Sequence, residues 1–222
     1  MSFAILKLSY NAIGDQQLEG GICGSGFFIN KRTFLTAHHV LNSKSKLPNK
    51  GFKYCQFWLI SRTNQIIEVT DEFIKDFSTI DTSMIKFSND QNVSCQKINE
   101  NRPKVGDKIS NLGYIGSSMP KIDAHWCSTK LSIKSADIAN SRADGFGIIN
   151  SISKMKITSN DVNINDKTII TTSYPGIIGM SGGASQNEMN EINGILSLGL
   201  PPDVQKKAFM GAIWIKEVLE II

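Results

Sequence analysis

Residues 34–41 read FLTAHHVL, and two adjacent histidines stand where an apolar, strand-like run ends. Neighbouring side chains on a strand point to opposite faces, so at most one of His38 and His39 can serve a given site. A histidine that takes part in chemistry needs a group that orients its ring and a group that exchanges a proton with it. Two other stretches of the chain offer such partners.

The first partner is an acid at the start of a second apolar run, Asp81 in DTSMIKF (residues 81–87). A carboxylate at the mouth of an apolar strand can be partly buried, accept the Nδ1 proton of a histidine and fix its tautomer. The second is the serine in GMSGG (residues 179–183), where flanking glycines permit backbone conformations that other residues resist. There, backbone N–H groups can converge on an oxyanion.

The composition is that of a soluble globular protein and excludes two broad classes. The chain has 222 residues, of which 41% are hydrophobic and 20% charged, and no run approaches the roughly 18 apolar residues of a membrane span. A net charge of +4 is too small for a dedicated nucleic-acid binder. The lysines at 44, 46, 50 and 53 lie in a polar loop, which predicts a solvated segment, the alternative being a patch that attracts acidic partners.

Short β-rich runs between turn residues predict an all-β sandwich or barrel. One helix is expected, at the C-terminal end, because the apolar residues of WIKEVLEII (residues 214–222) follow an i, i+3, i+4, i+7 pattern. The strands are expected at residues 3–10, 26–30, 33–37, 57–62, 66–70, 81–87, 108–115, 130–134, 147–152, 154–159, 167–174, 193–199 and 209–213.

Together the motifs resemble those of the chymotrypsin-fold, or trypsin-like, serine proteases, and most closely the bacterial and viral members without disulfides. The resemblance spans the chain: GSGF, TAHHV, DTSMIK, VGDKISNLGY, GMSGG and NGILSLG follow in the family's order. It implies two six-stranded antiparallel β-barrels with the site in the crevice between them. We therefore predict an N-terminal barrel over residues 1–92, a linker over 93–106, and a C-terminal barrel over 107–222 that ends in the helix.

The resemblance also assigns roles. The catalytic histidine is the fourth residue of the TAxHV motif, which makes His39 the base and leaves His38 to point elsewhere. Asp71 and Asp76 lie near Asp81, but neither is followed by the alternating apolar strand that places the family's acid, so Asp81 is predicted to orient the histidine. Ser181 would be the nucleophile, and the backbone N–H groups of residues 179 and 181 would form the oxyanion hole.

Two departures from the family pattern concern the disulfide beside the catalytic histidine and activation from a zymogen. Secreted relatives have a disulfide from the strand that carries Cys23 to the residue after the catalytic histidine, which here is Val40. Zymogen-activated relatives have an aspartate before the nucleophile, where this chain has Met180, and an IVGG-like start that is absent here. The expectation is a serine endopeptidase that needs no amino-terminal cleavage.

The resemblance also indicates which segments would contact the substrate. The family's pocket base corresponds to Pro175, which offers no charge for a lysine or arginine side chain, and the opposite wall corresponds to Ser197, Leu198 and Gly199. The backbone of this wall would pair with the substrate as an added strand. A small or apolar residue before the cleaved bond is the leading expectation.

The remaining expectations concern compartment, cofactors and partners. The first residues lack a signal-peptide pattern, and four cysteines lie far apart, so free thiols and a cytoplasmic location are expected. His125 and Cys127, with Cys95 and Cys55 as distant ligands, are the nearest approach to a zinc pattern, but no CxxC occurs, and neither metal nor cofactor is predicted.

The expected partners are protein or peptide substrates, with neither nucleic acid nor membrane. Two alternatives stay open: a protease-like binding or scaffold module without turnover, and an effector or polyprotein-processing protease that a partner protein activates.

Overall fold

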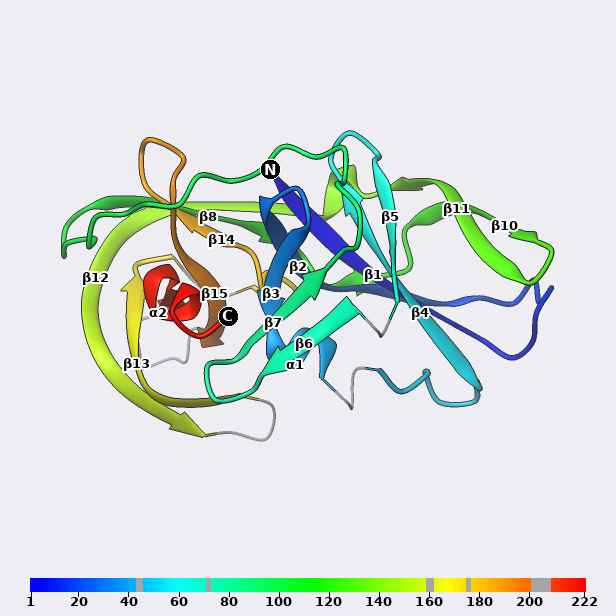
Figure 1. Ribbon diagram of the computed structural model, residues 1–222, viewed down its shortest axis with the longest axis horizontal. Coiled ribbons are helices and arrows are strands. Elements are labelled where there is room, and N and C mark those ends of the chain that lie inside the picture. The colour runs from blue at the N-terminus through cyan, green and yellow to red at the C-terminus, as the bar shows by residue number, and fades with distance from the viewer. Residues whose placement is uncertain (43–45, 71–72, 159–161, 175–176, 201–208) are drawn as a thin grey trace.

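A computed structural model describes residues 1–42, 46–70, 73–158, 162–174, 177–200 and 209–222. This part of the chain is mostly antiparallel strand, arranged as a curved sheet and a closed barrel side by side (Figure 1). Short helices occur at α1 (His38–Leu41) and α2 (Ile215–Leu219), with a 3-10 turn at Ala139–Ser141. The predicted all-β double-barrel architecture with a short C-terminal helix is confirmed.

The first half of the chain forms a half-barrel sheet with the strand order β5-β4-β1-β2-β3-β7-β6, to which β9 adds beside β2. Its strands are β1 (Ser2–Tyr10), β2 (Glu19–Asn30), β3 (Thr33–Ala37), β4 (Tyr54–Ser61), β5 (Ile66–Val69), β6 (Ile74–Phe77), β7 (Thr82–Lys86) and β9 (Ser117–Ser118). The helical turn α1 follows β3 directly, so the register of β3 determines where the two histidines lie.

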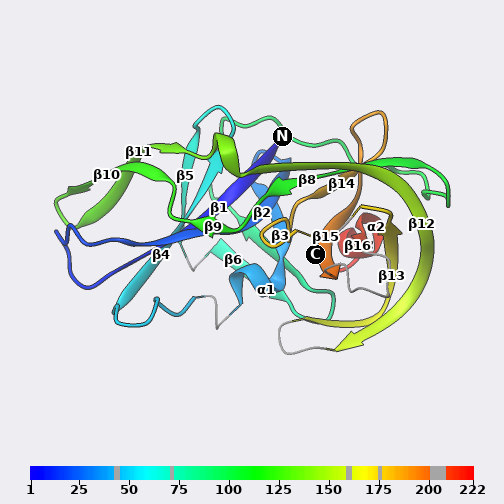
Figure 2. The same ribbon diagram turned by 180° about the vertical axis from the view of Figure 1, so that it is seen from behind.

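The second half forms a closed barrel with the order β12-β13-β16-β15-β14-β8. Its strands are β8 (Lys108–Tyr114), β12 (Arg142–Thr158), β13 (Asn163–Thr172), β14 (Ala184–Gln186), β15 (Ile192–Leu200) and β16 (Phe209–Trp214). The long β12 curves around the outside of this barrel (Figure 2). The helix α2 is fixed to β13 because Glu217 accepts hydrogen bonds from the N–H and the hydroxyl of Thr168, at 2.8 and 2.6 Å.

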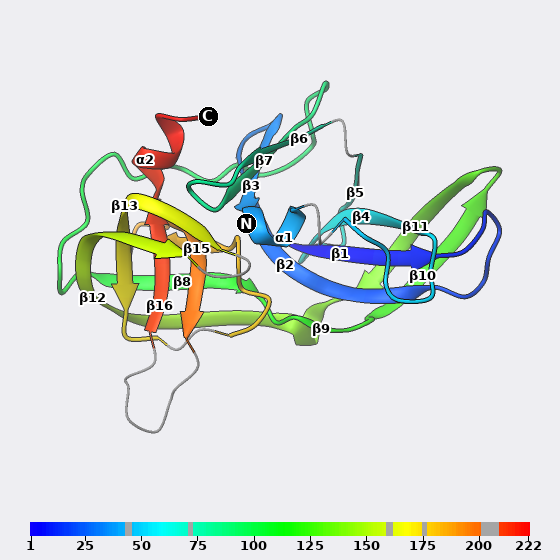
Figure 3. The ribbon, with the colours of Figure 1, turned by 90° about the horizontal axis from the view of Figure 1, so that it is seen from below.

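A hairpin from the second half covers the outer face of the first sheet. Within the described part of the chain, strands β10 (Lys121–Cys127) and β11 (Lys130–Asp137) pair only with each other, and they lie at the end of the molecule away from the closed barrel (Figure 3). Side chains of β1 alternate between two cores: Phe3 and Ile5 join the core inside the sheet, whereas Leu6 and Leu8 join the core beneath the hairpin. This two-sided burial explains why the first strand is apolar almost throughout.

The two halves meet through a shared apolar core. Phe27, Leu35, Ile80 and Met84 of the first half pack with residues of the closed barrel and with Val218 of α2. This packing fixes the first sheet against the barrel, so groups at the ends of β3, β7 and β15 have defined positions relative to one another.

Several strands differ from the sequence-based expectation. The strands expected at residues 147–152 and 154–159 form one strand, β12, because irregularities in its pairing with β13 let it bend without ending. Strands β6, β9, β10 and β14 were not predicted. The division into residues 1–92, 93–106 and 107–222 stays a prediction, and the helix expected over residues 214–222 is α2. Among the described residues, no helix is both long enough and apolar enough to span a membrane.

The aromatic centre of the first sheet gives a test of the fold. Phe28 is fully buried, with ring centroids 5.2 Å from Phe3, 5.0 Å from Phe34 and 5.8 Å from Phe87. We expect Phe28→Ala to lower the free energy of unfolding by about 3–5 kcal/mol, because it leaves a cavity among these rings. Phe146→Ala, at a side chain that is 79% exposed, should change it by about 0.5 kcal/mol or less. Urea denaturation of both variants measures the difference, and equal effects would contradict this description of the core.

Candidate active site

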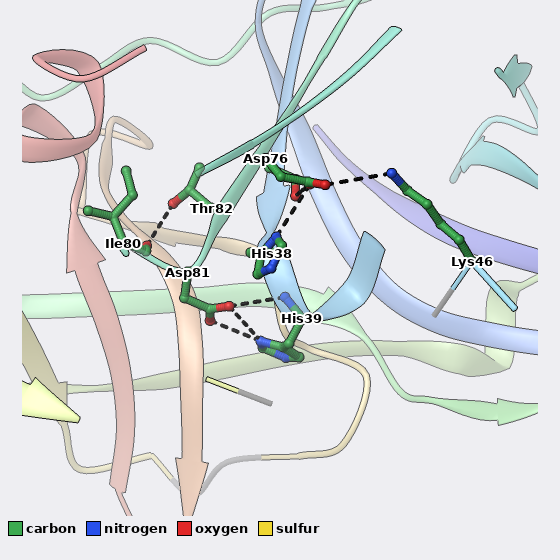
Figure 4. A network of polar contacts seen from close by, with 8 residues as sticks. His38, His39, Lys46, Asp76, Ile80, Asp81 and Thr82 are labelled. Carbon is green, nitrogen blue, oxygen red and sulfur yellow. Dashed lines mark hydrogen bonds and ion pairs between the residues drawn. The ribbon is translucent and has the colours of Figure 1, made fainter. Parts of the chain in front are cut away.

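His39 and Asp81 form a hydrogen-bonded pair at the junction of the two halves. Nδ1 of His39 lies 2.9 Å from Oδ2 and 3.1 Å from Oδ1 of Asp81 (Figure 4). The backbone N–H of His39 also donates to Oδ1, at 3.0 Å. Because a carboxylate only accepts, Nδ1 carries the proton, and Nε2 of the neutral ring is left as an acceptor.

The Asp81 carboxylate is fully buried and is held from three directions. Besides the two bonds from His39, it accepts a hydrogen bond on Oδ2 from the hydroxyl of Ser197 in β15. Asp81 has a φ of +42°, a left-handed conformation that aspartate adopts more readily than most residues, just before β7 begins. The turn thus directs the carboxylate into the junction, where the second half supplies one of its hydrogen-bond donors.

His38 points away from this pair, as predicted. Its Nδ1 lies 3.3 Å from Oδ1 of Asp76 on β6, and Lys46 Nζ lies 3.6 Å from Oδ2 of the same carboxylate (Figure 4). The hydroxyl of Ser83 donates to Asp76 as well. The adjacent histidines therefore face different carboxylates, His39 through hydrogen bonds and His38 through a 3.3 Å contact that lacks hydrogen-bond geometry. Asp71 lies outside the described residues.

The loop that carries Ser181 has every carbonyl of residues 178–181 hydrogen-bonded. In chain order the donors are the N–H of Gly116 (2.7 Å), the hydroxyl of Ser25 (2.9 Å), the N–H of Gly183 (2.9 Å) and the N–H of Ser25 (2.8 Å). In a planar trans peptide the N–H points opposite to the carbonyl. The N–H groups of Gly179 and Ser181 are therefore directed away from Gly116 and Gly183.

Those two N–H groups are candidates for binding an anionic oxygen. Within the described part of the chain, neither donates a backbone hydrogen bond, whereas the N–H of Met180 between them donates to Ile177 at 3.1 Å. Hydrogen-bond donors fixed by the protein and left without an internal acceptor are what an oxyanion hole requires.

Two glycines let the loop approach the rest of the site. Gly179 has a φ of +94°, and a Cβ there would lie 1.8 Å from the N of Gly116. Gly182 has a φ of +83°, and a Cβ there would lie 2.1 Å from Oγ1 of Thr36 and 2.8 Å from the N of Ala37. Since Ala37 immediately precedes the two histidines, the residue after Ser181 packs against the turn that carries His39.

The predicted substrate-binding residues fall in two places. Pro175 lies outside the described residues. Ser197, Leu198 and Gly199 lie on β15, whose pairing with β14 ends at Ile195, while its other edge stays paired to β16 up to Leu200. The β15 backbone beyond Leu196 therefore offers an edge on the side away from β16, which is the geometry that strand addition needs.

The contacts of two residues at the site, Ser197 and Ser25, were not predicted from the sequence. Ser197 was predicted to line the substrate wall, yet its side chain is 4% exposed and contacts Asp81. Ser25 lies in the GSGF motif, and its contact with the Ser181 loop joins residues far apart in the chain. Its place between two glycines in a strand is the one sequence signal that marks it.

The potential metal ligands named from the sequence do not form a cluster. Among the described residues, no group of three or more His, Cys, Asp or Glu side chains is placed to hold a metal ion. The four cysteines are free thiols, with Cys95 and Cys127 exposed and Cys23 and Cys55 partly buried.

A sequence model of the trypsin-like peptidase domain matches residues 24–195, and the chain belongs to this family. No curated protein sequence matches the chain. Its fold resembles that of solved serine proteases. The sequence identities are low, so this likeness establishes only the fold.

Three of these structures illustrate the likeness. The active form of the Rv3671c protease from M. tuberculosis has 13% identity and a TM-score of 0.61, with 98% of this chain and 78% of that one covered. The HtrA-type protease AlgW with a decapeptide has 13% identity and a TM-score of 0.67, with coverage of 99% and 62%. The serine endoprotease from Yersinia pestis has 18% identity and a TM-score of 0.57, with coverage of 98% and 61%. The chain thus spans less than two thirds of these last two proteins.

The thiols give a test of the environment around the site. Burial raises the pKa of Cys23 to about 12, so at pH 8 almost none of this thiol is in the reactive thiolate form. We expect iodoacetamide to alkylate Cys95 and Cys127 in the folded protein and to leave Cys23 unmodified until denaturant is added. Peptide mass spectrometry measures the order, and modification of Cys23 as fast as of Cys127 would contradict the packing of β2.

Proposed function

We propose that the chain is a serine endopeptidase that hydrolyses peptide bonds in protein substrates through His39, Asp81 and Ser181. The observation that carries the proposal is the buried Asp81 carboxylate bonded to Nδ1 of His39. This pairing leaves Nε2 as the basic nitrogen of a neutral ring, which is what a general base for a serine hydroxyl requires.

The mechanism assigns one task to each group. Ser181 Oγ attacks the substrate carbonyl while Nε2 of His39 accepts its proton, and His39 then protonates the leaving amine. Asp81 stabilises the imidazolium that forms in between. The N–H groups of Gly179 and Ser181 bind the oxyanion of the tetrahedral intermediate, and water hydrolyses the acyl-enzyme by the same steps in reverse.

We further propose that this site is competent without amino-terminal cleavage. Met180 is fully buried in an apolar cluster with Leu196, Met210 and neighbouring alanines, so no ion pair is needed at that position. The carbonyl bonds from Gly116, Ser25 and Gly183 instead support the conformation of the loop. Neither of these interactions requires a newly formed amino terminus.

We extend the proposal to the substrate and the compartment. The open edge of β15 beyond Leu196 favours an extended peptide as substrate, with a small or apolar residue before the cleaved bond. Four free thiols favour a reducing compartment, in keeping with the cytoplasmic location expected from the sequence. A catalytically silent scaffold and a protease that a partner protein activates remain the alternatives.

Active-site labelling separates these possibilities. We expect a fluorophosphonate to form one adduct, on Ser181, and we expect Ser181→Ala and His39→Ala to abolish it, because one lacks the nucleophile and the other lacks its base. His38→Ala should keep most of the labelling, since His38 pairs with Asp76 instead. Gel fluorescence and peptide mass spectrometry give the result.

The outcomes that contradict the proposal are distinct. A folded wild-type chain that does not label would favour the silent scaffold, and labelling that begins only on adding a cell extract would favour partner activation. A folded His38→Ala variant that does not label, together with a labelled His39→Ala variant, would exchange the roles of the two histidines.

A further inference from the structure

We propose that Ser25 is a positioning residue that holds the nucleophile loop in the conformation in which the N–H groups of Gly179 and Ser181 can bind the oxyanion. The inference rests on the peptidase function proposed above and deepens it. Under this proposal Ser25, on β2 of the first sheet, supports the site although it is not the acid, the base or the nucleophile.

The hydroxyl of Ser25 has a donor and an acceptor role, and both connect it to the second half of the chain. It donates to the carbonyl of Gly179 at 2.9 Å, and it accepts the N–H of Tyr114 on β8 at 2.8 Å. The residue is fully buried. One side chain on β2 therefore links the barrel strand β8 to the loop that precedes Ser181.

The backbone of Ser25 makes two further connections. Its N–H donates to the carbonyl of Ser181 at 2.8 Å, and its carbonyl accepts the hydroxyl of Thr36 on β3 at 2.7 Å. Thr36 lies shortly before His39 in the same strand and turn. Ser25 thus touches both the segment that carries the base and the loop that carries the nucleophile, and it sets their separation.

The Ser25 hydroxyl also lies close to the backbone of β8. A Cβ on Gly113 would lie 3.0 Å from the Ser25 hydroxyl itself. The absence of a side chain at Gly113 therefore leaves room for this hydroxyl beside β8.

Loss of the hydroxyl would leave two buried groups without partners, the carbonyl of Gly179 and the N–H of Tyr114. A buried, unpaired polar group is unfavourable, and the loop can relieve it by turning the peptide between Gly179 and Met180. Glycine permits such a rotation at low cost. The rotation would carry the N–H of Met180 away from Ile177 and move the backbone on either side of that peptide. It would thereby shift the N–H groups of Gly179 and Ser181 and weaken the binding of the oxyanion without touching His39 or Asp81.

Ser25→Ala and Ser61→Ala form a matched pair for the test. Ser61 on β4 is also fully buried, and its hydroxyl accepts the N–H of Gln65 at 2.9 Å and lies 3.1 Å from the hydroxyl of Thr63. Both variants lose a buried serine hydroxyl with two hydrogen-bonding partners. A purely structural role would affect them alike, whereas a positioning role affects the acylation rate of only one.

The measurement is the second-order rate constant for a fluorophosphonate reacting with Ser181, at a temperature where melting curves show each variant folded. We expect Ser25→Ala to react at least about tenfold more slowly than wild type, since loss of one oxyanion donor costs about 10²–10³ in rate. Ser61→Ala should react within about twofold of wild type. A folded Ser25→Ala variant that reacts at the wild-type rate would overturn the inference and leave the peptidase function intact.

A second variant covers the case in which Ser25→Ala does not fold. Ser25→Cys keeps the shape of the side chain with a weaker donor, and it should react at a rate between those of wild type and a variant that lacks the bond. Hydrogen exchange of the Tyr114 amide, followed by NMR, should be faster in this variant than in Ser61→Ala. Unchanged exchange and unchanged reaction rate would overturn the inference, while an unreactive wild-type chain would overturn the peptidase function and, with it, the inference.

Discussion

The buried carboxylate of Asp81 is the constraint on which the arrangement of the site depends. A charge without contact with water is strongly unfavourable unless hydrogen bonds surround it. Here the donors come from α1 and from β15, which belong to the two different halves of the chain. The hydroxyl of Ser197 reaches the carboxylate only when the first sheet and the closed barrel are docked, so docking completes the set of hydrogen bonds around Asp81.

The same junction holds the nucleophile loop, by different means. Asp81 orients His39, the proposed base, through hydrogen bonds from its carboxylate, whereas the loop is held through its own carbonyls, two of them by Ser25. Glycines at 179 and 182 allow this close approach, and Met180 anchors the loop in an apolar cluster. His39 and the Ser181 loop are thus held by different hydrogen bonds, and Ser25 connects the two through Thr36 on β3 and the carbonyl of Ser181.

The fold class and the local form of each motif could be predicted because they depend on short stretches of sequence. Two examples are the apolar strand that ends at His38 and His39 and the acid that precedes another apolar strand. Both patterns can be recognised without knowing the rest of the fold. The contacts of Ser25 and Ser197 could not be predicted, because they join residues that only the tertiary fold brings together. The hairpin of β10 and β11 was missed in part for a similar reason. Most of its apolar side chains are only partly buried, and they are covered by contact with the first sheet, so the alternation of apolar and polar residues along the two strands is weak.

The central claim is that Asp81 orients His39 so that His39 can activate Ser181, and the rate at which a fluorophosphonate acylates Asp81→Asn tests it most directly. The carboxamide preserves shape but can donate to Nδ1, which places the ring proton on Nε2 and leaves no base facing Ser181. The account predicts a folded variant, by far-UV circular dichroism, that reacts about 10⁴-fold more slowly than wild type. A folded Asp81→Asn variant that reacts within about tenfold of wild type would contradict it.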